Sequence, residues 1–139
     1  ETAETFQRWI KRGKFLEYAM VHQNYYGTPK DFVISQLKRN RDIILDIDVQ
    51  GGRTLMNKFP EGLYIFVAPP SMRELNRRLR HRGSDSPMTI KKRLIMAKKE
   101  LKDKRFYNYV VFNSDLKKTV NLVYSMIKFE RYKRHRKWT

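Results

Sequence analysis

The first residues of the chain carry the hydrophobic pattern of an amphipathic helix. Phe6, Trp9 and Ile10 are spaced so that they share one helical face. This spacing predicts a helix over residues 3–12. Gly13 follows it directly and is suited to ending it, because glycine readily adopts the left-handed conformation found after helices.

A predicted strand and turn come next. The strand is KFLEYAMVH, residues 14–22, whose apolar character is interrupted by one carboxylate, Glu17. The following NYYG, residues 24–27, predicts a turn. Thr28 then suits the N-cap of another helix and Pro29 its first position, since a hydroxyl can accept from the first free amides and proline has no amide to satisfy.

Three further apolar runs predict buried strands, and helical segments separate them. The runs are IIL at residues 43–45, LYIFVA at 63–68 and YVVFN at 109–113. Strands that alternate with helices indicate an α/β fold with a largely parallel sheet and helices on both faces. In such sheets, ligands bind beyond the carboxyl ends of the strands.

Capping residues predict where the later helices begin and end. Ser71, with a glutamate three residues on, has the spacing of a capping box, and Gly83 closes the helix that follows. Ser86 as N-cap and Pro87 at the first position start the next helix. A last helix is predicted from about Asp115 into the basic tail.

The composition is strongly basic. The 139 residues include 31 Lys and Arg against 14 Asp and Glu, a formal net charge of +17. This charge favours anionic partners such as nucleotides, nucleic acid or acidic membrane surfaces, although solvated lysine-rich faces alone can produce it. The lack of cysteine excludes disulfides and thiolate metal sites. The apolar runs are too short to span a bilayer.

Two carboxylates and two glycines after the run 43–45 are candidate ligand residues. Asp46 and Asp48 are two positions apart, so they share a face if the strand continues through them. Gly51 and Gly52 follow. Like charges held close are costly unless a metal ion, an arginine or a donor-rich ligand meets them. The alternative is a solvent-exposed pair that caps the next helix.

Glu17 and the two tyrosines of NYYG are a second group of candidates. A carboxylate buried in a strand needs a partner. The adjacent N1–H and N2–H₂ donors of guanine would fit Glu17, an arginine would serve as well, and an exposed edge position is a third alternative. The hydroxyls of Tyr25 and Tyr26 can donate to a phosphate beside a helix N-terminus, or the rings can simply pack.

Arginines gather around the short loop GSDSP between two predicted helices. Such a helix–loop–helix arm can clamp phosphates, because phosphoryl transfer depends on positioning and charge neutralisation. The alternative is a solvated basic face. The arginines are Arg77, Arg78, Arg80, Arg82 and Arg93. The histidines are far apart and lack metal-ligand spacing, so we predict no metal site held by the protein alone.

Taken in order, these segments resemble the guanylate kinase family. The matching segments are GKFLEYAMVHQNYYGT, ILDIDVQGG, KFPEGLYIFVAPPS, RLRHRGSDS, KKRL and YVVFNSDL, which extend over most of the chain. The resemblance implies a P-loop kinase-like three-layer fold with a helical lid and a GMP-binding subdomain. It also implies transfer of the γ-phosphoryl group of ATP to GMP, with ATP as co-substrate and Mg²⁺ bound mainly through the nucleotide phosphates.

The resemblance assigns five residues to GMP. It implies that Glu17 is the carboxylate that binds guanine and that Thr28 is a hydroxyl contacting the base. Tyr26 corresponds to a ligand of the GMP phosphate, whereas Tyr25 is expected to be structural. Asp48 corresponds to a residue on the guanine side, and Gly51 lets the backbone approach.

Five other residues are assigned to ATP and to the transfer itself. Arg82 and Arg93 match the lid arginines that close on the transferring phosphates, and Arg78 is a further phosphate ligand on the ATP side. Asn113 matches a position near adenine. Asp46 is expected nearer the metal and the phosphates.

The resemblance divides the chain into four parts. These are the remaining GMP-binding subdomain at 1–31, core at 32–76, the lid at 77–95, and core with a basic C-terminal helix at 96–139. The family's phosphate loop, G-x-x-x-x-G-K-[ST], does not occur in these 139 residues. The resemblance places it upstream, so we expect a longer parent kinase and little activity from this chain alone.

Two other functions remain open at this point. A guanylate-kinase-like module that binds proteins would keep the fold but lose phosphate-handling residues, whereas Arg82, Arg93 and Asp48 are present here. The charge and the tail RYKRHRK suggest a nucleic-acid-binding protein, but no groove-reading motif occurs. We expect a cytoplasmic protein that binds GMP and ATP, neither a membrane nor specific nucleic acid, and is a monomer or homodimer.

Overall fold

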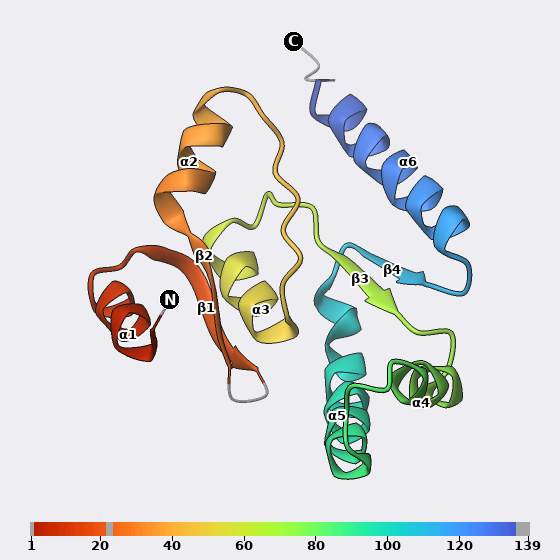
Figure 1. The fold of residues 1–139 in the computed structure, drawn as a ribbon. Helices are drawn as coiled ribbons and strands as arrows, with labels where there is room; N and C mark the ends of the chain where they lie inside the picture. The colour runs from red at the N-terminus through yellow and green to blue at the C-terminus, as the bar shows by residue number, and fades with distance from the viewer. Residues whose placement is uncertain (1, 22–23, 136–139) are drawn as a thin grey trace. The chain divides into compact units, whose positions relative to one another are not determined.

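A β-hairpin is the centre of the first half of the chain (Figure 1). In the computed structural model, which describes residues 2–21 and 24–135, strand β1 (Phe15–Val21) pairs antiparallel with β2 (Asn24–Pro29). The hairpin belongs to the first of two compact units, Glu1–Gly62, and the second unit is Leu63–Thr139.

Helices α1 (Ala3–Lys11) and α3 (Val49–Lys58) lie on opposite sides of this hairpin, and α2 (Lys30–Lys38) follows β2. Aromatic rings join α1 to the hairpin: the Phe6 ring stacks on Phe15 at 4.5 Å and on Tyr25 at 5.1 Å between centroids. Gly27 lies under these rings, since a Cβ there would be 2.9 Å from the Phe15 ring.

Strand β1 contains a bulge at Leu16. Phe15 pairs with Pro29 and Glu17 pairs with Thr28, so β1 uses two steps where β2 uses one. As a result Phe15 and Glu17, two positions apart, point to opposite faces. Phe15 packs toward α1, and Glu17 points toward α3.

The predicted turn at 24–27 is wrong, because these residues form most of strand β2. The predicted N-cap role of Thr28 is wrong for the same reason. Pro29 is the N-cap of α2 rather than its first residue, and its side chain makes no capping hydrogen bond. Pairing with β1 outweighs the local turn preference of glycine and proline here.

The strand predicted at residues 43–45 is also wrong. Residues 41–48 have no regular secondary structure, and Ile44 is 81% exposed. A strand exists only where its backbone pairs with a neighbour, and none of the described residues pairs with this run.

The second unit contains a parallel pair of strands. β3 (Ile65–Ala68) pairs with β4 (Tyr109–Phe112), and the connection runs through α4 (Met72–His81), α5 (Pro87–Glu100) and the 3₁₀ helix η1 (Leu101–Phe106). The last helix, α6 (Leu116–His135), contacts β4. The core of this unit consists of Phe66, Ala68, Leu79, Ile90 and Val111.

The predicted caps of this unit are confirmed. The Ser71 hydroxyl accepts from the Glu74 amide at 3.1 Å, and the Ser86 hydroxyl accepts from the Thr89 amide at 3.2 Å. Gly83 has a φ of 66°, as expected for a glycine that ends a helix.

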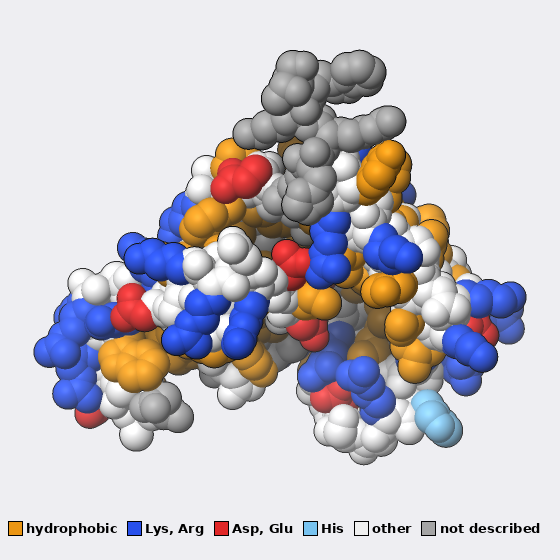
Figure 2. All heavy atoms as spheres, turned by 90° about the horizontal axis from the view of Figure 1, so that it is seen from above, with side chains coloured by type: hydrophobic (Ala, Val, Ile, Leu, Met, Phe, Trp, Pro, Cys, Tyr) orange, Lys and Arg blue, Asp and Glu red, His pale blue; other side chains and the backbone are white. Residues whose placement is uncertain are grey.

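Lys and Arg side chains are exposed on the surface, and apolar side chains are interspersed among these basic side chains (Figure 2). Across the part of the chain that the structure describes, no helix combines the length and apolar character needed to cross a bilayer.

Candidate functional site

Glu17 is buried on the hairpin face that meets α3. Glu17 is only 4% exposed. The hydroxyl of Thr28, which lies directly opposite on β2, donates a hydrogen bond to Glu17 Oε1. No ion pair to an arginine is found for Glu17 among residues 2–21 and 24–135. Since a carboxylate has two oxygens and about four acceptor sites, this site retains capacity for a ligand's donors.

The first turn of α3 comes close to this carboxylate. A Cβ on Gly51 would lie 3.0 Å from Glu17 Cδ and 3.2 Å from Asp48 Oδ1, so only glycine fits between the two carboxylates without displacement. Asp48 is the N-cap of α3 and accepts from the Gly51 amide at 2.8 Å. The structure therefore brings Glu17, Thr28, Asp48 and Gly51 together.

Tyr26 lies on the same hairpin face as Glu17. It pairs with Ala19, two residues beyond Glu17, and alternate positions of a strand share a face. Its side chain is 57% exposed. Tyr25 lies on the opposite face, where its ring stacks on Phe6 and its hydroxyl accepts from Gln7 Nε2 at 3.0 Å.

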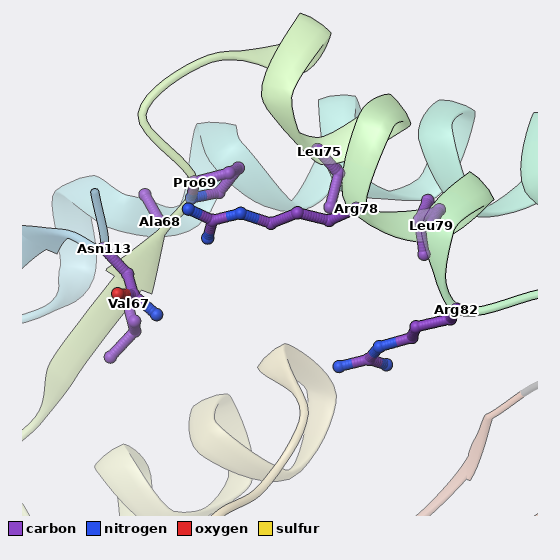
Figure 3. Close-up of a pocket in the computed structure, with 8 residues that line it drawn as sticks. All are labelled: Val67, Ala68, Pro69, Leu75, Arg78, Leu79, Arg82 and Asn113. Carbon is purple, nitrogen blue, oxygen red and sulfur yellow. The ribbon is translucent and has the colours of Figure 1, made fainter. Parts of the chain in front are cut away.

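A hollow of about 220 Å³ lies in the second unit, at the carboxyl end of the parallel strands (Figure 3). Arg78 and Arg82 approach it from α4 and its C-cap, and Asn113 approaches it from the end of β4. The Thr119 hydroxyl donates to Asn113 Oδ1 at 3.2 Å, which fixes the amide with its NH₂ free for a ligand. The three residues assigned to ATP thus line one hollow.

Two arginines of α4, Arg77 and Arg78, form ion pairs with Glu74, whereas Arg80 Nε donates to Asn76 Oδ1 at 3.1 Å. Glu74 accepts from Arg77 at 2.7 Å and 2.8 Å and from Arg78 Nε at 2.7 Å. The hydrogen bonds from Arg77 and Arg78 lower the pKa of Glu74 to about 2. Arg77 therefore belongs to a helix-surface cluster, whereas Arg78 both pairs with Glu74 and lines the hollow.

Arg93 does not line the hollow. Its Nε lies 3.3 Å from Asp85 Oδ2 in the loop before α5. Both atoms are buried, and neither has a hydrogen bond of good geometry, so the interaction is chiefly a contact between opposite charges. The sequence analysis did not single out Asp85, whose contact with Arg93 depends on how the loop folds against α5.

Asp46 takes no part in the hydrogen bonds that join Thr28 to Glu17 and Gly51 to Asp48. It is exposed, in the irregular stretch before α3, and has no hydrogen-bond partner among the described residues. The same described residues contain no group of three or more His, Cys, Asp or Glu side chains that could hold a metal ion.

Comparison with known proteins identifies the family. The family model for guanylate kinase matches residues 2–130. The chain belongs to the guanylate kinase family. It is 44% identical over 127 residues to the guanylate kinase of Caldanaerobacter subterraneus, covering 91% of this chain and 62% of that protein. It is 46% identical over 126 residues to the guanylate kinase of Fusobacterium nucleatum, and this match covers 91% of this chain and 68% of that protein.

A solved guanylate kinase, from Anaplasma phagocytophilum, is similar to the structure with a TM-score of 0.79. The two are 30% identical, and the match covers 94% of this chain and 63% of that one. The predicted α/β fold of the guanylate kinase family is thereby confirmed. The chain spans less than two thirds of the length of the curated relatives from Caldanaerobacter, Clostridioides and Carboxydothermus.

Proposed function

We propose that this chain is part of a guanylate kinase, which transfers the γ-phosphoryl group of ATP to GMP and releases ADP and GDP. The observation that carries the proposal is the buried Glu17 carboxylate, set between Thr28 and Gly51 on the face that also holds Tyr26. Enzymes named guanylate kinase are similar over most of the chain, which supports the same conclusion.

Guanine fits this arrangement better than adenine. The N1–H and N2–H₂ groups of guanine are adjacent donors for Glu17, and Thr28 and Asp48 flank the same space. Adenine has an acceptor at N1 and no 2-amino group, so it would leave the buried carboxylate unpaired. An unpaired buried polar group rejects a ligand efficiently.

The phosphates are assigned to hydroxyl and guanidinium groups. We propose that the Tyr26 hydroxyl donates to the GMP phosphate and that Asn113 and Arg78 bind ATP at the hollow. Arg82 and Arg93 are proposed to neutralise charge on the phosphoryl group during transfer, with Asp46 near the metal ion and the phosphates. Mg²⁺, held mainly by the nucleotide phosphates, would offset part of the same charge.

A protein-binding module without catalysis is the second candidate. The presence of Arg82, Arg93 and Asp48 argues against it, because such a module has no need for residues that bind a nucleotide. We place the protein in the cytoplasm with GMP and ATP as its ligands, consistent with a chain that lacks cysteine.

The test compares GMP and AMP as acceptors in a coupled assay of ADP release with the full-length protein. We expect turnover with GMP and little with AMP. Glu17→Gln removes the charge and places an NH₂ donor beside the donors of guanine. It should raise the Kd for GMP at least about tenfold, because a charge-assisted hydrogen bond contributes roughly 1.5–3 kcal/mol.

Glu4→Gln is the matched control, since Glu4 is exposed in the first turn of α1 and the substitution is identical. It should leave both the GMP affinity and the preference over AMP unchanged. Calorimetric titration that finds the same GMP affinity in Glu17→Gln as in the parent would overturn the assignment of Glu17. Absence of ADP release in the full-length protein would favour the binding module.

A further inference from the structure

We propose that Lys58 is a positioning residue for Glu17. Its ammonium group binds the backbone carbonyl at the bulge of β1 and so holds the carboxylate on the α3 face of the hairpin. This proposal rests on the proposed function, in which Glu17 selects guanine, and it adds a residue that contacts no nucleotide.

The bulge decides which way Glu17 points. Leu16 is the extra residue of β1, inserted between the pairs Phe15–Pro29 and Glu17–Thr28. Without it, the alternation of the strand would place Glu17 on the same face as Phe15, among the aromatic rings that pack against α1. The position of the carboxylate therefore depends on keeping this one residue bulged.

The bulge leaves Leu16 outside the paired positions of the two strands. An inserted residue falls outside the pattern of strand hydrogen bonds, and Leu16 is only 4% exposed, so its carbonyl has little access to water. Lys58 Nζ donates to this carbonyl at 2.6 Å. The interaction is short and charge-assisted, which makes it stronger than a neutral hydrogen bond.

Lys58 acts from the same helix that approaches Glu17. Gly51, in the first turn of α3, lies against the Glu17 carboxylate, and Lys58 is the last residue of that helix. The two are seven residues apart, which is about two helical turns, so they project from one face. Helix α3 is thus attached to β1 at Leu16 and closely packed at Glu17.

The expected consequence is a loss of base selectivity rather than a general loss of binding. Without the Lys58 ammonium, the buried Leu16 carbonyl loses this hydrogen bond. Conformations that remove the bulge and restore regular strand pairing then become more populated. These conformations withdraw the carboxylate from guanine. AMP forms no hydrogen bond with that carboxylate and is disfavoured by it, so the affinity for AMP should not fall.

The experiment compares Lys58→Met, which replaces the ammonium group but keeps a side chain of similar length, with Lys58→Arg, which retains a charged donor. We expect Lys58→Met to raise the Kd for GMP about 5- to 10-fold in calorimetric titrations without raising the Kd for AMP. Lys58→Arg should restore the GMP affinity to within about twofold of the parent. Lys38→Met is the control, since Lys38 is an exposed last-turn lysine of α2.

A second readout requires no nucleotide. The ¹³C resonance of the Glu17 carboxyl, assigned by its disappearance in Glu17→Gln, should move in Lys58→Met and stay in place in Lys38→Met. A lower melting temperature alone would indicate only a structural role. If Lys58→Met does not fold, Lys58→Gln, which keeps a neutral donor, replaces it in both measurements.

The two proposals fail in distinguishable ways. If Glu17→Gln weakens GMP binding but Lys58→Met changes neither the ratio of GMP to AMP affinity nor the Glu17 resonance, the role of Lys58 is refuted and the kinase assignment stands. If Glu17→Gln leaves GMP affinity unchanged, the guanine assignment is refuted whatever Lys58→Met does to the resonance.

Discussion

Substituting Gly51 by alanine tests the closest contact of the candidate site. The added methyl group would lie 3.0 Å from Glu17 Cδ, closer still to one carboxylate oxygen, and 3.2 Å from Asp48 Oδ1. The carboxylate is the end of a flexible side chain and must shift to admit the methyl group. In doing so it leaves the position in which it accepts from Thr28.

The magnitude follows from that displacement. The same shift moves Glu17 away from the donors of guanine, and loss of one such proposed hydrogen bond to a charged group costs about 1.5–3 kcal/mol, or roughly 10- to 150-fold in the Kd for GMP. The effect on folding should be smaller, because alanine is favoured over glycine in a helix by up to about 1 kcal/mol and offsets part of the loss. Weak binding with nearly normal stability is therefore the expected signature.

Calorimetric titration with GMP and urea unfolding measure the two quantities on one preparation. Gln50→Ala is the control, since Gln50 is the exposed neighbour in the same turn. It should leave GMP binding and stability close to those of the parent. If Gly51→Ala binds GMP with a Kd within about twofold of the parent, the close packing of α3 on Glu17 does not contribute to GMP binding, and the prediction is refuted.

Two further predictions concern the second unit. Asp85→Asn removes the charge facing Arg93 and should lower the free energy of unfolding in urea by about 1–3 kcal/mol, the cost of leaving a buried polar group without its partner. Equal stability would mean that the pair is dispensable. The pKa of Glu74 is about 2, below its usual 4.5, because Arg77 and Arg78 bond to it. These bonds therefore stabilise the fold above pH 4.5 and lose that effect as the pH falls toward 2. Between those pH values the melting temperature of the parent should fall more steeply than that of Glu74→Gln, and parallel curves would contradict the prediction.

Local signals in the sequence were sufficient where a helix or strand depends on its own residues. The caps at Ser71 and Ser86 and the glycine at position 83 were predicted correctly, because each acts within one turn of the chain. The same local reasoning failed for NYYG. Its glycine, followed shortly by proline, favours a turn, but pairing of these residues with β1 makes a strand.

Non-local contacts were beyond the sequence analysis. The Leu16 bulge, its hydrogen bond from Lys58 and the pairing of Asp85 with Arg93 all depend on how separate segments meet. The run at 43–45 failed for a related reason, since hydrophobicity favours a strand but only a neighbouring strand can complete one. The resemblance to guanylate kinases did indicate Glu17, Thr28, Asp48 and Gly51, and these four residues lie together.

The two strand pairings should also differ in how quickly they form. In the hairpin, Val21 pairs with Asn24, so the chain needs to close only a very short loop. In the second unit, Ile65 pairs with Tyr109 across α4, α5 and η1. Closing a long loop costs more conformational entropy than closing a short one. We therefore expect the amides of the hairpin to become protected from hydrogen exchange early in refolding and those of the parallel pair last.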